Sequence, residues 1–266
     1  MTDFVSPPPP TLRRREFLAA LGAAALAACH HPAIGDREEA LLGRLSARPR
    51  APRPSRTPRA LGVVPLRLTN GGGRDGLLYV PAGYRPNAPM ALVVMLHGSD
   101  TSAKDALAPL QPLADSAGMI VLAPDSRERT WDIVLGSFGA DVAFIDRALD
   151  ATFRNYAIDP GRIAIAGFSD GASEALSLGV TNGEMFTRIM AFSPGLIAST
   201  RGRGRPLIFD AYGDRDTVFP SDINHAIVRR LRSAGYDVRE REFADGHTIP
   251  PEVAKEAIDW LLSGWS

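Results

Sequence analysis

A serine in a glycine-flanked turn is the residue of this chain best placed for covalent chemistry. Residues 167–171 read G-F-S-D-G, the pattern G-x-S-x-G, between the apolar run 162–166 and an Ala- and Leu-rich segment, 172–180. Between a strand and a helix, this pattern makes a sharp turn that exposes the hydroxyl, here that of Ser169. An ordinary glycine-rich turn is the alternative, because the motif also arises by chance. A nucleophilic serine further needs a histidine base and an acid that orients it.

Among the five histidines, His247 has the position that such a base requires. It lies in the loop 244–250, between a strand predicted at 238–243 and a terminal helix predicted at 251–263. The chain order serine, acid, histidine is the order of α/β-hydrolases and differs from the two other common serine-hydrolase orders. A histidine that only structures its loop is the alternative.

Three aspartates between the serine and the histidine are candidates for the acid. Asp214 and Asp216 follow a strand predicted at 206–212, and Asp210, a weaker candidate, lies within that strand. In the tight turn G-D-R-D, one carboxylate can face the imidazole while the other caps the turn. Spacing alone therefore leaves the choice between Asp214 and Asp216 open.

Two backbone N–H groups are expected to bind the negative charge that develops on the carbonyl oxygen of the ester. One belongs to Asp170, the residue after the nucleophile, and the other to Ser99, which follows Gly98 in the loop after an apolar strand, 91–96. We expect His97 to be structural or to line the substrate pocket. The Asp170 carboxylate is unfavourable beside this charge unless it points away or is paired. It could equally cap the following helix, where the helix dipole favours it.

Several of these segments together resemble the phospholipase/carboxylesterase group of α/β-hydrolases, which includes acyl-protein thioesterase-like enzymes and small bacterial serine esterases. The resemblance extends from about Val64 to the C-terminus, and its motifs lie at 92–99, 167–171, 213–220 and 246–250.

The acid and base loops of that family allow a residue-by-residue transfer. Its acid loop reads G-x-x-D-x-x-V-P and its base lies in GH-x-x-P, which implies Asp216 as the acid and His247 as the base. The family's elbow usually reads GFSQG, so Asp170 replaces a glutamine. Because the donor at this position is a backbone N–H, the departure affects substrate preference more than activity.

Alternating strands and helices predict an α/β-hydrolase fold, a mostly parallel, doubly wound sheet with helices on both faces and no large lid. An early hairpin, 63–69 with 77–80, is expected at the sheet edge. The longest irregular stretch, 126–138, contains Trp131, which either lines the acyl or alcohol pocket or packs on the base of its own loop. The expected strands are 91–96, 119–123, 162–166, 188–192, 206–212 and 238–243, and the helices are 103–117, 140–156, 171–181, 221–234 and 251–263.

The N-terminus predicts export and a lipid anchor. Residues 13–18, R-R-R-E-F-L, resemble a twin-arginine signal, and the apolar run 17–28 is too short to span a bilayer. Residues 26–29, L-A-A-C, resemble a bacterial lipobox that ends in Cys29, the only cysteine. We therefore expect a signal peptide over 1–28, lipidation of Cys29, and a periplasmic or cell-surface lipoprotein anchored in a membrane. An incidental cysteine is the alternative.

Composition divides the remaining chain into two parts. Residues 29–60 are rich in Pro and Arg and predict an extended linker, either a passive tether or one weakly attracted to anionic lipid. Residues 61–266 predict one catalytic domain. The formal charge is +1 over 1–28 and +4 over 29–60, which leaves about −5 for this domain, so nothing suggests nucleic acid. We found no metal-ligand spacing or cofactor motif, and the oligomeric state stays open.

These residues together predict a serine hydrolase that cleaves a small-molecule or lipid carboxylic ester through a Ser-His-Asp triad and an acyl-enzyme. A thioesterase, a lysophospholipase, and a depolymerase or peptidase on the same fold are the enzymatic alternatives. A non-catalytic lipoprotein that binds a ligand is the alternative of another class, and the intact triad argues against it. The sequence does not specify the acyl chain or the leaving group.

Overall fold

The computed structural model describes residues 34–51, 59–69 and 73–265. Of two compact units, one spans Asp36–Ser266, and the other, Met1–Gly35, contributes only two described residues. The predicted signal peptide and Cys29 therefore lie outside the described residues.

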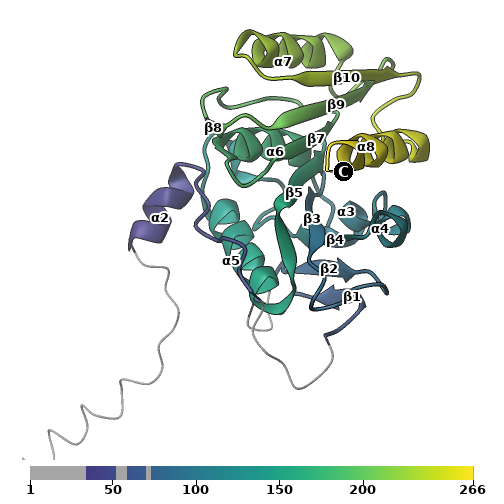
Figure 1. The fold of residues 1–266 in the computed structure, drawn as a ribbon. Coiled ribbons are helices and arrows are strands. Elements are labelled where there is room, and N and C mark those ends of the chain that lie inside the picture. The colour runs from purple at the N-terminus through teal and green to yellow at the C-terminus, as the bar shows by residue number, and fades with distance from the viewer. Residues whose placement is uncertain (1–33, 52–58, 70–72, 266) are drawn as a thin grey trace, which may run out of the picture. The chain divides into compact units, whose positions relative to one another are not determined.

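The core of the larger unit is an eight-stranded sheet of order β1-β2-β4-β3-β5-β7-β9-β10 (Figure 1). β1 and β2 form the antiparallel edge hairpin, β2 is antiparallel to β4, and the remaining pairs are parallel. This topology confirms the predicted α/β-hydrolase fold. The strands are β1 (Gly62–Pro65), β2 (Gly76–Val80), β3 (Met90–Leu96), β4 (Met119–Pro124), β5 (Ile158–Phe168), β7 (Arg188–Phe192), β9 (Leu207–Gly213) and β10 (Val238–Phe243), with β6 (Asn182–Gly183) and β8 (Arg203–Gly204) in a separate small sheet.

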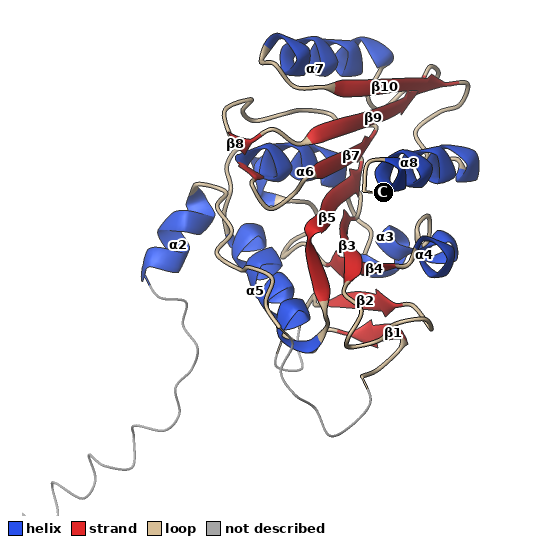
Figure 2. Cartoon of the chain, viewed as in Figure 1, coloured by secondary structure: helices blue, strands red, loops and turns tan. Residues whose placement is uncertain are grey.

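Helices cover both faces of the sheet (Figure 2). The apolar sides of α5, α6 and α7 pack in one buried cluster, and those of α3, α4 and α8 pack in another on the opposite face. The central strands are buried on both faces, as their Ile-, Val-, Leu- and Ala-rich sequences indicate. The helices are α2 (Ile34–Leu41), α3 (Ala103–Leu107), α4 (Gln111–Ala117), α5 (Ala140–Asn155), α6 (Asp170–Thr181), α7 (Ser221–Ser233) and α8 (Pro251–Ser263).

The helix predicted at 103–117 is divided into α3 and α4. Pro109 has no N–H to donate to the preceding turn, and its ring disfavours a continuous helix there. A second proline, Pro112, is accommodated in the first turn of α4, where a proline is tolerated. The division matters for the site because Ala106, Ala108 and Pro109 border the cavity described below.

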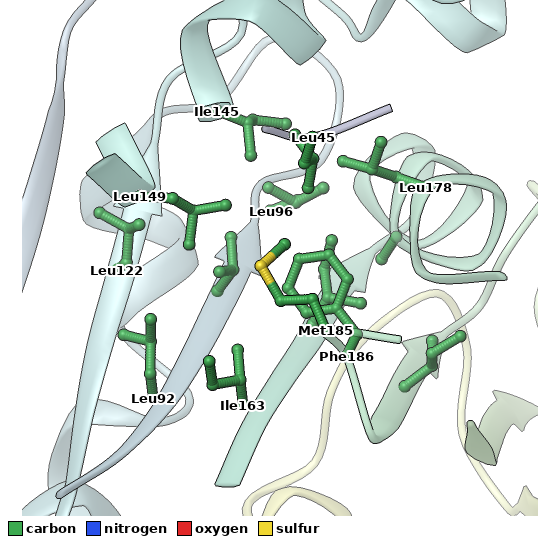
Figure 3. Close-up of a cluster of buried hydrophobic side chains, with 14 of the residues drawn as sticks. Leu45, Leu92, Leu96, Leu122, Ile145, Leu149, Ile163, Leu178, Met185 and Phe186 are labelled. Carbon is green, nitrogen blue, oxygen red and sulfur yellow. The ribbon is translucent and has the colours of Figure 1, made fainter. Parts of the chain in front are cut away.

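Residues 40–47 of the predicted linker pack against the folded domain, contrary to our expectation. Ala40, Leu45 and Ala47 are buried in the cluster of α5, α6 and α7, and Leu45 lies among its side chains in Figure 3. Apolar side chains placed between the arginines explain this burial, because the arginines keep their charged ends at the surface. We call residues 43–50 the strap.

Polar side chains of α5 and of the turn after α6 bind the strap's backbone. Asn182 accepts a hydrogen bond from the Leu45 N–H (3.0 Å) and donates one to the Gly43 carbonyl (2.7 Å). Asp146 on α5 accepts from the N–H groups of Ser46 and Ala47, both at 2.8 Å. The composition of 29–60 indicated charge and extension, but it did not reveal these partners, which lie between 99 and 139 positions away in the sequence.

Candidate active site

The predicted elbow joins β5 to α6, with Ser169 between them in a strained conformation. Its φ is 57° and its ψ is −122°, a region that residues other than glycine rarely occupy. The Ser169 N–H donates to the Phe192 carbonyl at 2.9 Å, which secures the turn. A Cβ atom at Gly167 would collide with the backbone of Gly171, and one at Gly171 would collide with the carbonyl of His97. Both flanking glycines are therefore required by close backbone approach.

Ser169, His247 and Asp216 form one chain of hydrogen bonds. The Ser169 Oγ lies 2.9 Å from His247 Nε2, and His247 Nδ1 lies 2.6 Å from Asp216 Oδ2. With the Nδ1 proton donated to the carboxylate, Nε2 is free to accept the serine proton. Rings of Phe168 and Phe219 contact the imidazole, at centroid distances of 4.8 and 5.6 Å.

Burial and hydrogen-bond partners distinguish Asp216 from Asp214 and Asp210, the two other candidates for the acid. Its side chain is buried, and burial would raise its pKa, but hydrogen bonds from His247 and from the N–H groups of Val218 and Phe219 outweigh burial and lower it. Asp214 is exposed and lies 3.6 Å from Arg215. Asp210 is buried within β9, away from this hydrogen-bond chain, and burial raises its pKa.

Backbone hydrogen bonds join the acid loop to the base loop. The Asp214 N–H donates to Phe243 O at 2.8 Å, and the Arg215 N–H donates to Asp245 O at 3.0 Å. Because β9 and β10 are parallel neighbours, their carboxyl ends bring the two loops to the same edge of the sheet. Asp216 and His247 thus have a fixed separation despite the 31 positions between them.

The two N–H groups expected to bind an oxyanion are not used by the protein itself. Among the described residues, the N–H groups of Ser99 and Asp170 have no hydrogen-bond partner. By contrast, the N–H of Asp100, the residue after Ser99, donates to Arg129 O at 2.8 Å. Asp100 has a φ of 59°, which turns the chain after Ser99. The Asp170 carboxylate is paired, since it accepts a hydrogen bond from Thr130 Oγ1 at 2.5 Å.

His97 is buried and supports the loop that carries Ser99. Its Nδ1 lies 2.7 Å from Gly98 O, and its Nε2 accepts from the Ser126 N–H at 2.9 Å and contacts Arg74 at 3.0 Å. This pattern requires a neutral ring with its proton on Nδ1, in agreement with a pKa lowered by burial. The ring borders the cavity described below but is only 1% exposed, so its hydrogen bonds make it structural.

Trp131 does not line a pocket, which corrects one of the two interpretations offered above. Its side chain is fully buried, and its Nε1 donates to His97 O at 2.7 Å. The rings of Trp131 and His97 lie 4.8 Å apart. Trp131 therefore packs beneath its own loop, because a buried indole N–H finds its partner in the adjacent backbone.

A cavity of about 340 Å³ opens beside His247 and the Ser99 loop. Its walls come from β3, from the α3–α4 connection, from the end of β5 and from the base loop. The apolar side chains that line it include Met95, Ala106, Pro109, Phe168 and Ile249. Such a lining beside His247 suits an uncharged organic group.

Some contacts of this site have no counterpart in the sequence analysis. Thr130 and Arg74 both contact the predicted oxyanion region, yet both lie in stretches without a periodic pattern. The only available signal was Asp170, whose carboxylate beside a developing negative charge calls for a partner. Among the described residues, no helix has the length and apolar character needed to cross a bilayer, and no three His, Cys, Asp or Glu side chains gather as metal ligands would.

A doubly covered, mostly parallel sheet with a nucleophile elbow, an acid loop and a base loop at its carboxyl edge defines an α/β-hydrolase. The chain matches the phospholipase/carboxylesterase family over residues 123–263, and it belongs to that family.

Among proteins of this kind, feruloyl esterase C of Emericella nidulans is 29% identical over 167 residues, which are 58% of this chain and 61% of that protein. The poly(3-hydroxybutyrate) depolymerase of Ralstonia pickettii is 30% identical over 140 residues, or 45% of this chain and 29% of that protein. The matches thus span less than two thirds of these relatives. The crystal structure of esterase PE8 has a TM-score of 0.60 and 26% identity, and it covers 72% of this chain and 99% of that one.

Proposed function

We propose that this protein is a serine carboxylesterase in which Ser169, His247 and Asp216 form the catalytic triad. The observation that carries the proposal is the unbroken hydrogen-bond chain from the serine hydroxyl through the imidazole to the buried carboxylate. Membership of the phospholipase/carboxylesterase family and esterase names among the relatives support an ester as the bond cleaved.

The reaction follows from the positions of these groups. Ser169 Oγ attacks the ester carbonyl carbon while His247 Nε2 takes its proton, and the N–H groups of Ser99 and Asp170 bind the resulting oxyanion. The intermediate then expels the alcohol, which receives the proton from His247. A water molecule, deprotonated by the same imidazole, attacks the acyl carbon. The bond between that carbon and Ser169 Oγ then breaks, Oγ takes the proton back from His247, and the acid leaves. Asp216 orients the imidazole and stabilises its positive form.

A compact acyl or alcohol group is the substrate feature that the cavity favours. Its volume of about 340 Å³ lies at the small end of ligand pockets, which span roughly 300–1,000 Å³. Short aliphatic chains or a single aromatic ring suit this space better than a lipid chain does. The feruloyl esterases among the relatives make a hydroxycinnamate ester a useful member of any substrate panel.

Labelling with a fluorophosphonate probe tests the nucleophile. We expect Ser169→Ala to abolish both labelling and ester turnover, and Ser116→Ala, an exposed serine on α4, to preserve both. Labelling that persists in Ser169→Ala would contradict the assignment.

A panel of esters and thioesters tests the substrate class. We expect kcat/KM to be highest for short or single-ring acyl groups. A maximum at long chains or at lysophospholipids would favour the lipid hydrolase, and a preference for thioesters would favour the thioesterase. An absence of both labelling and turnover would favour the ligand-binding lipoprotein.

We propose that residues 1–28 direct export by the twin-arginine route and that Cys29 carries the lipid anchor. The arginine motif, the short apolar run and the single cysteine in a lipobox-like sequence support this location. We expect the wild-type protein in the membrane fraction of a bacterial host and Cys29→Ser in the soluble fraction. Equal partitioning of the two proteins would contradict the anchor.

A further inference from the structure

Three consecutive residues of the loop before α5 bind three parts of the oxyanion region. The carbonyl of Arg129 accepts from the Asp100 N–H (2.8 Å), and its guanidinium pairs with the Asp100 carboxylate. Thr130 Oγ1 donates to Asp170 at 2.5 Å, and Trp131 Nε1 donates to the His97 carbonyl at 2.7 Å. One short segment thus contacts both the Ser99 loop and the elbow, which supply the two donors separately.

The contact with Asp170 concerns charge as well as position. Asp170 is the first residue of α6, and Cα–Cβ bonds of a helix tilt toward its N-terminus. The Asp170 side chain therefore leaves the backbone on the side where the N–H of the same residue would bind the oxyanion. In that position the carboxylate and the oxyanion are both negative, and like charges repel one another strongly in a partly dehydrated site. Unless the carboxylate is held, it opposes the charge that its own backbone is proposed to stabilise.

We propose that Thr130 is a positioning residue, whose hydroxyl holds the Asp170 carboxylate and prevents it from turning toward the oxyanion. Among the described residues, the Thr130 hydroxyl is the one hydrogen-bond partner of this carboxylate, and no Lys or Arg pairs with it. The 2.5 Å distance is that of a strong hydrogen bond to an ionised group. This inference rests on the proposed esterase function, because it assigns Thr130 to the same reaction.

The first test replaces the Thr130 hydroxyl by a methyl group, which keeps the shape of the side chain. We expect Thr130→Val to lower kcat by about tenfold to a hundredfold, less than the loss of about 10²–10³-fold for an oxyanion donor. KM should change little, whereas the affinity for a boronic acid, whose adduct with the nucleophile is anionic and tetrahedral, should fall with kcat/KM. Thr130→Ser keeps the donor and should restore kcat.

Thr181, the last residue of α6, provides a matched control. Thr181 is half-buried and donates to the Ser177 carbonyl at 2.8 Å, so Thr181→Val also removes one hydroxyl from a hydrogen bond. We expect Thr181→Val to leave kcat and the boronic acid affinity unchanged. If both valine variants lost kcat equally, a general effect of packing would replace our proposal.

Neutralising the carboxylate provides the decisive test, because it removes the repulsion that Thr130 is proposed to prevent. In an Asp170→Asn background, we expect Thr130→Val to change kcat by no more than about twofold, so that the two substitutions are coupled. An undiminished effect of Thr130→Val in that background would overturn the proposal, as would a wild-type kcat in Thr130→Val itself. Absence of ester turnover and of a Ser169 adduct in the wild-type protein would instead overturn the proposed function, and the inference with it.

Discussion

The two carboxylate oxygens of Asp216 bind different partners, and this division suits the residue to its proposed role as the acid of the triad. Oδ1 accepts the N–H groups of Val218 and Phe219, which fixes the turn of the acid loop, while Oδ2 faces the imidazole of His247. These hydrogen bonds favour the ionised form despite burial. Asp214, two positions earlier in the same loop, is exposed and lacks such donors. Identical residue types thus acquire different roles from their surroundings.

Substitution at these two aspartates should separate their roles. We expect Asp216→Asn to lower kcat by about 10³–10⁴-fold, because an amide no longer selects the imidazole tautomer that accepts the serine proton. Asp214→Asn should keep kcat near the wild-type value. Initial rates of ester hydrolysis measure both effects, and circular dichroism verifies that both variants fold. A larger loss in Asp214→Asn would exchange the two assignments.

At the scale of the element, α6 combines the nucleophile elbow with a buried acid. Glu174 is fully buried, and neither carboxyl oxygen has a hydrogen-bond partner among the described residues. Burial, followed by the charges of Asp141 and Asp132, raises its pKa well above the usual range. The folded protein therefore retains the Glu174 proton to a higher pH than the unfolded chain does.

This proton makes stability depend on pH with a defined sign. A raised carboxyl pKa stabilises the fold below the unfolded value, and the contribution is lost as pH rises toward the folded pKa. We expect the free energy of unfolding to fall as pH rises above the ordinary range of a glutamate, by about 1.4 kcal/mol per pH unit for each proton that only the folded state retains. Asp210, whose pKa burial also raises, contributes a fall of the same sign, so Glu174→Gln should reduce the slope without abolishing it. Asp141, with a pKa raised to about 6, adds a fall of the same sign up to about that pH.

Urea unfolding at several pH values measures the slope, and Glu184→Gln is the matched control because Glu184 is exposed. The control should keep the wild-type slope. Equal slopes in the wild-type protein and Glu174→Gln would show that Glu174 does not carry the proton.

At the scale of the whole molecule, the strap adds a segment to the domain that the hydrolase motifs do not require. Leu45 is 4% exposed and packs with side chains of α5 and α6, whereas Leu42, three positions earlier, is 55% exposed. The bond from the Leu45 N–H to Asn182 satisfies a buried donor of the strap, and Asp146 holds the N–H groups of the next two residues nearer the surface. The folded unit therefore begins near Asp36, before the boundary at 61 that composition indicated.

The two leucines test this boundary within the full chain. We expect Leu45→Ala to lower the free energy of unfolding by about 2–4 kcal/mol, because it leaves a cavity among packed side chains. Leu42→Ala should change it by less than about 0.5 kcal/mol. Chemical denaturation measures both. A cost below about 0.5 kcal/mol for Leu45→Ala would mean that the strap adds little to stability.

Local patterns predicted the strands, most helices and the fold, because each element expresses its burial in its own sequence. The elbow around Ser169 and the base loop around His247 were predicted for the same reason. Asp216 was separated from Asp214 only by resemblance, since the difference lies in donors from other residues. Trp131, Thr130 and the strap depend on contacts between distant segments without periodicity, and no local pattern encodes such contacts.

If Cys29 carries the lipid anchor proposed above, burial of Ala40, Leu45 and Ala47 in the domain shortens the stretch of chain that could separate the domain from that anchor. For a chain acylated at Cys29, an anchor followed by a free linker up to residue 60 would allow roughly 100 Å of extension, at about 3.4 Å per residue. Because the compact unit starts at Asp36, the stretch from Cys29 to that residue spans at most about 24 Å when fully extended, which is less than the thickness of a lipid bilayer. An enzyme anchored in this way would act on esters that reach the membrane surface, because a polymer farther from the membrane than the length of this segment would not contact the site.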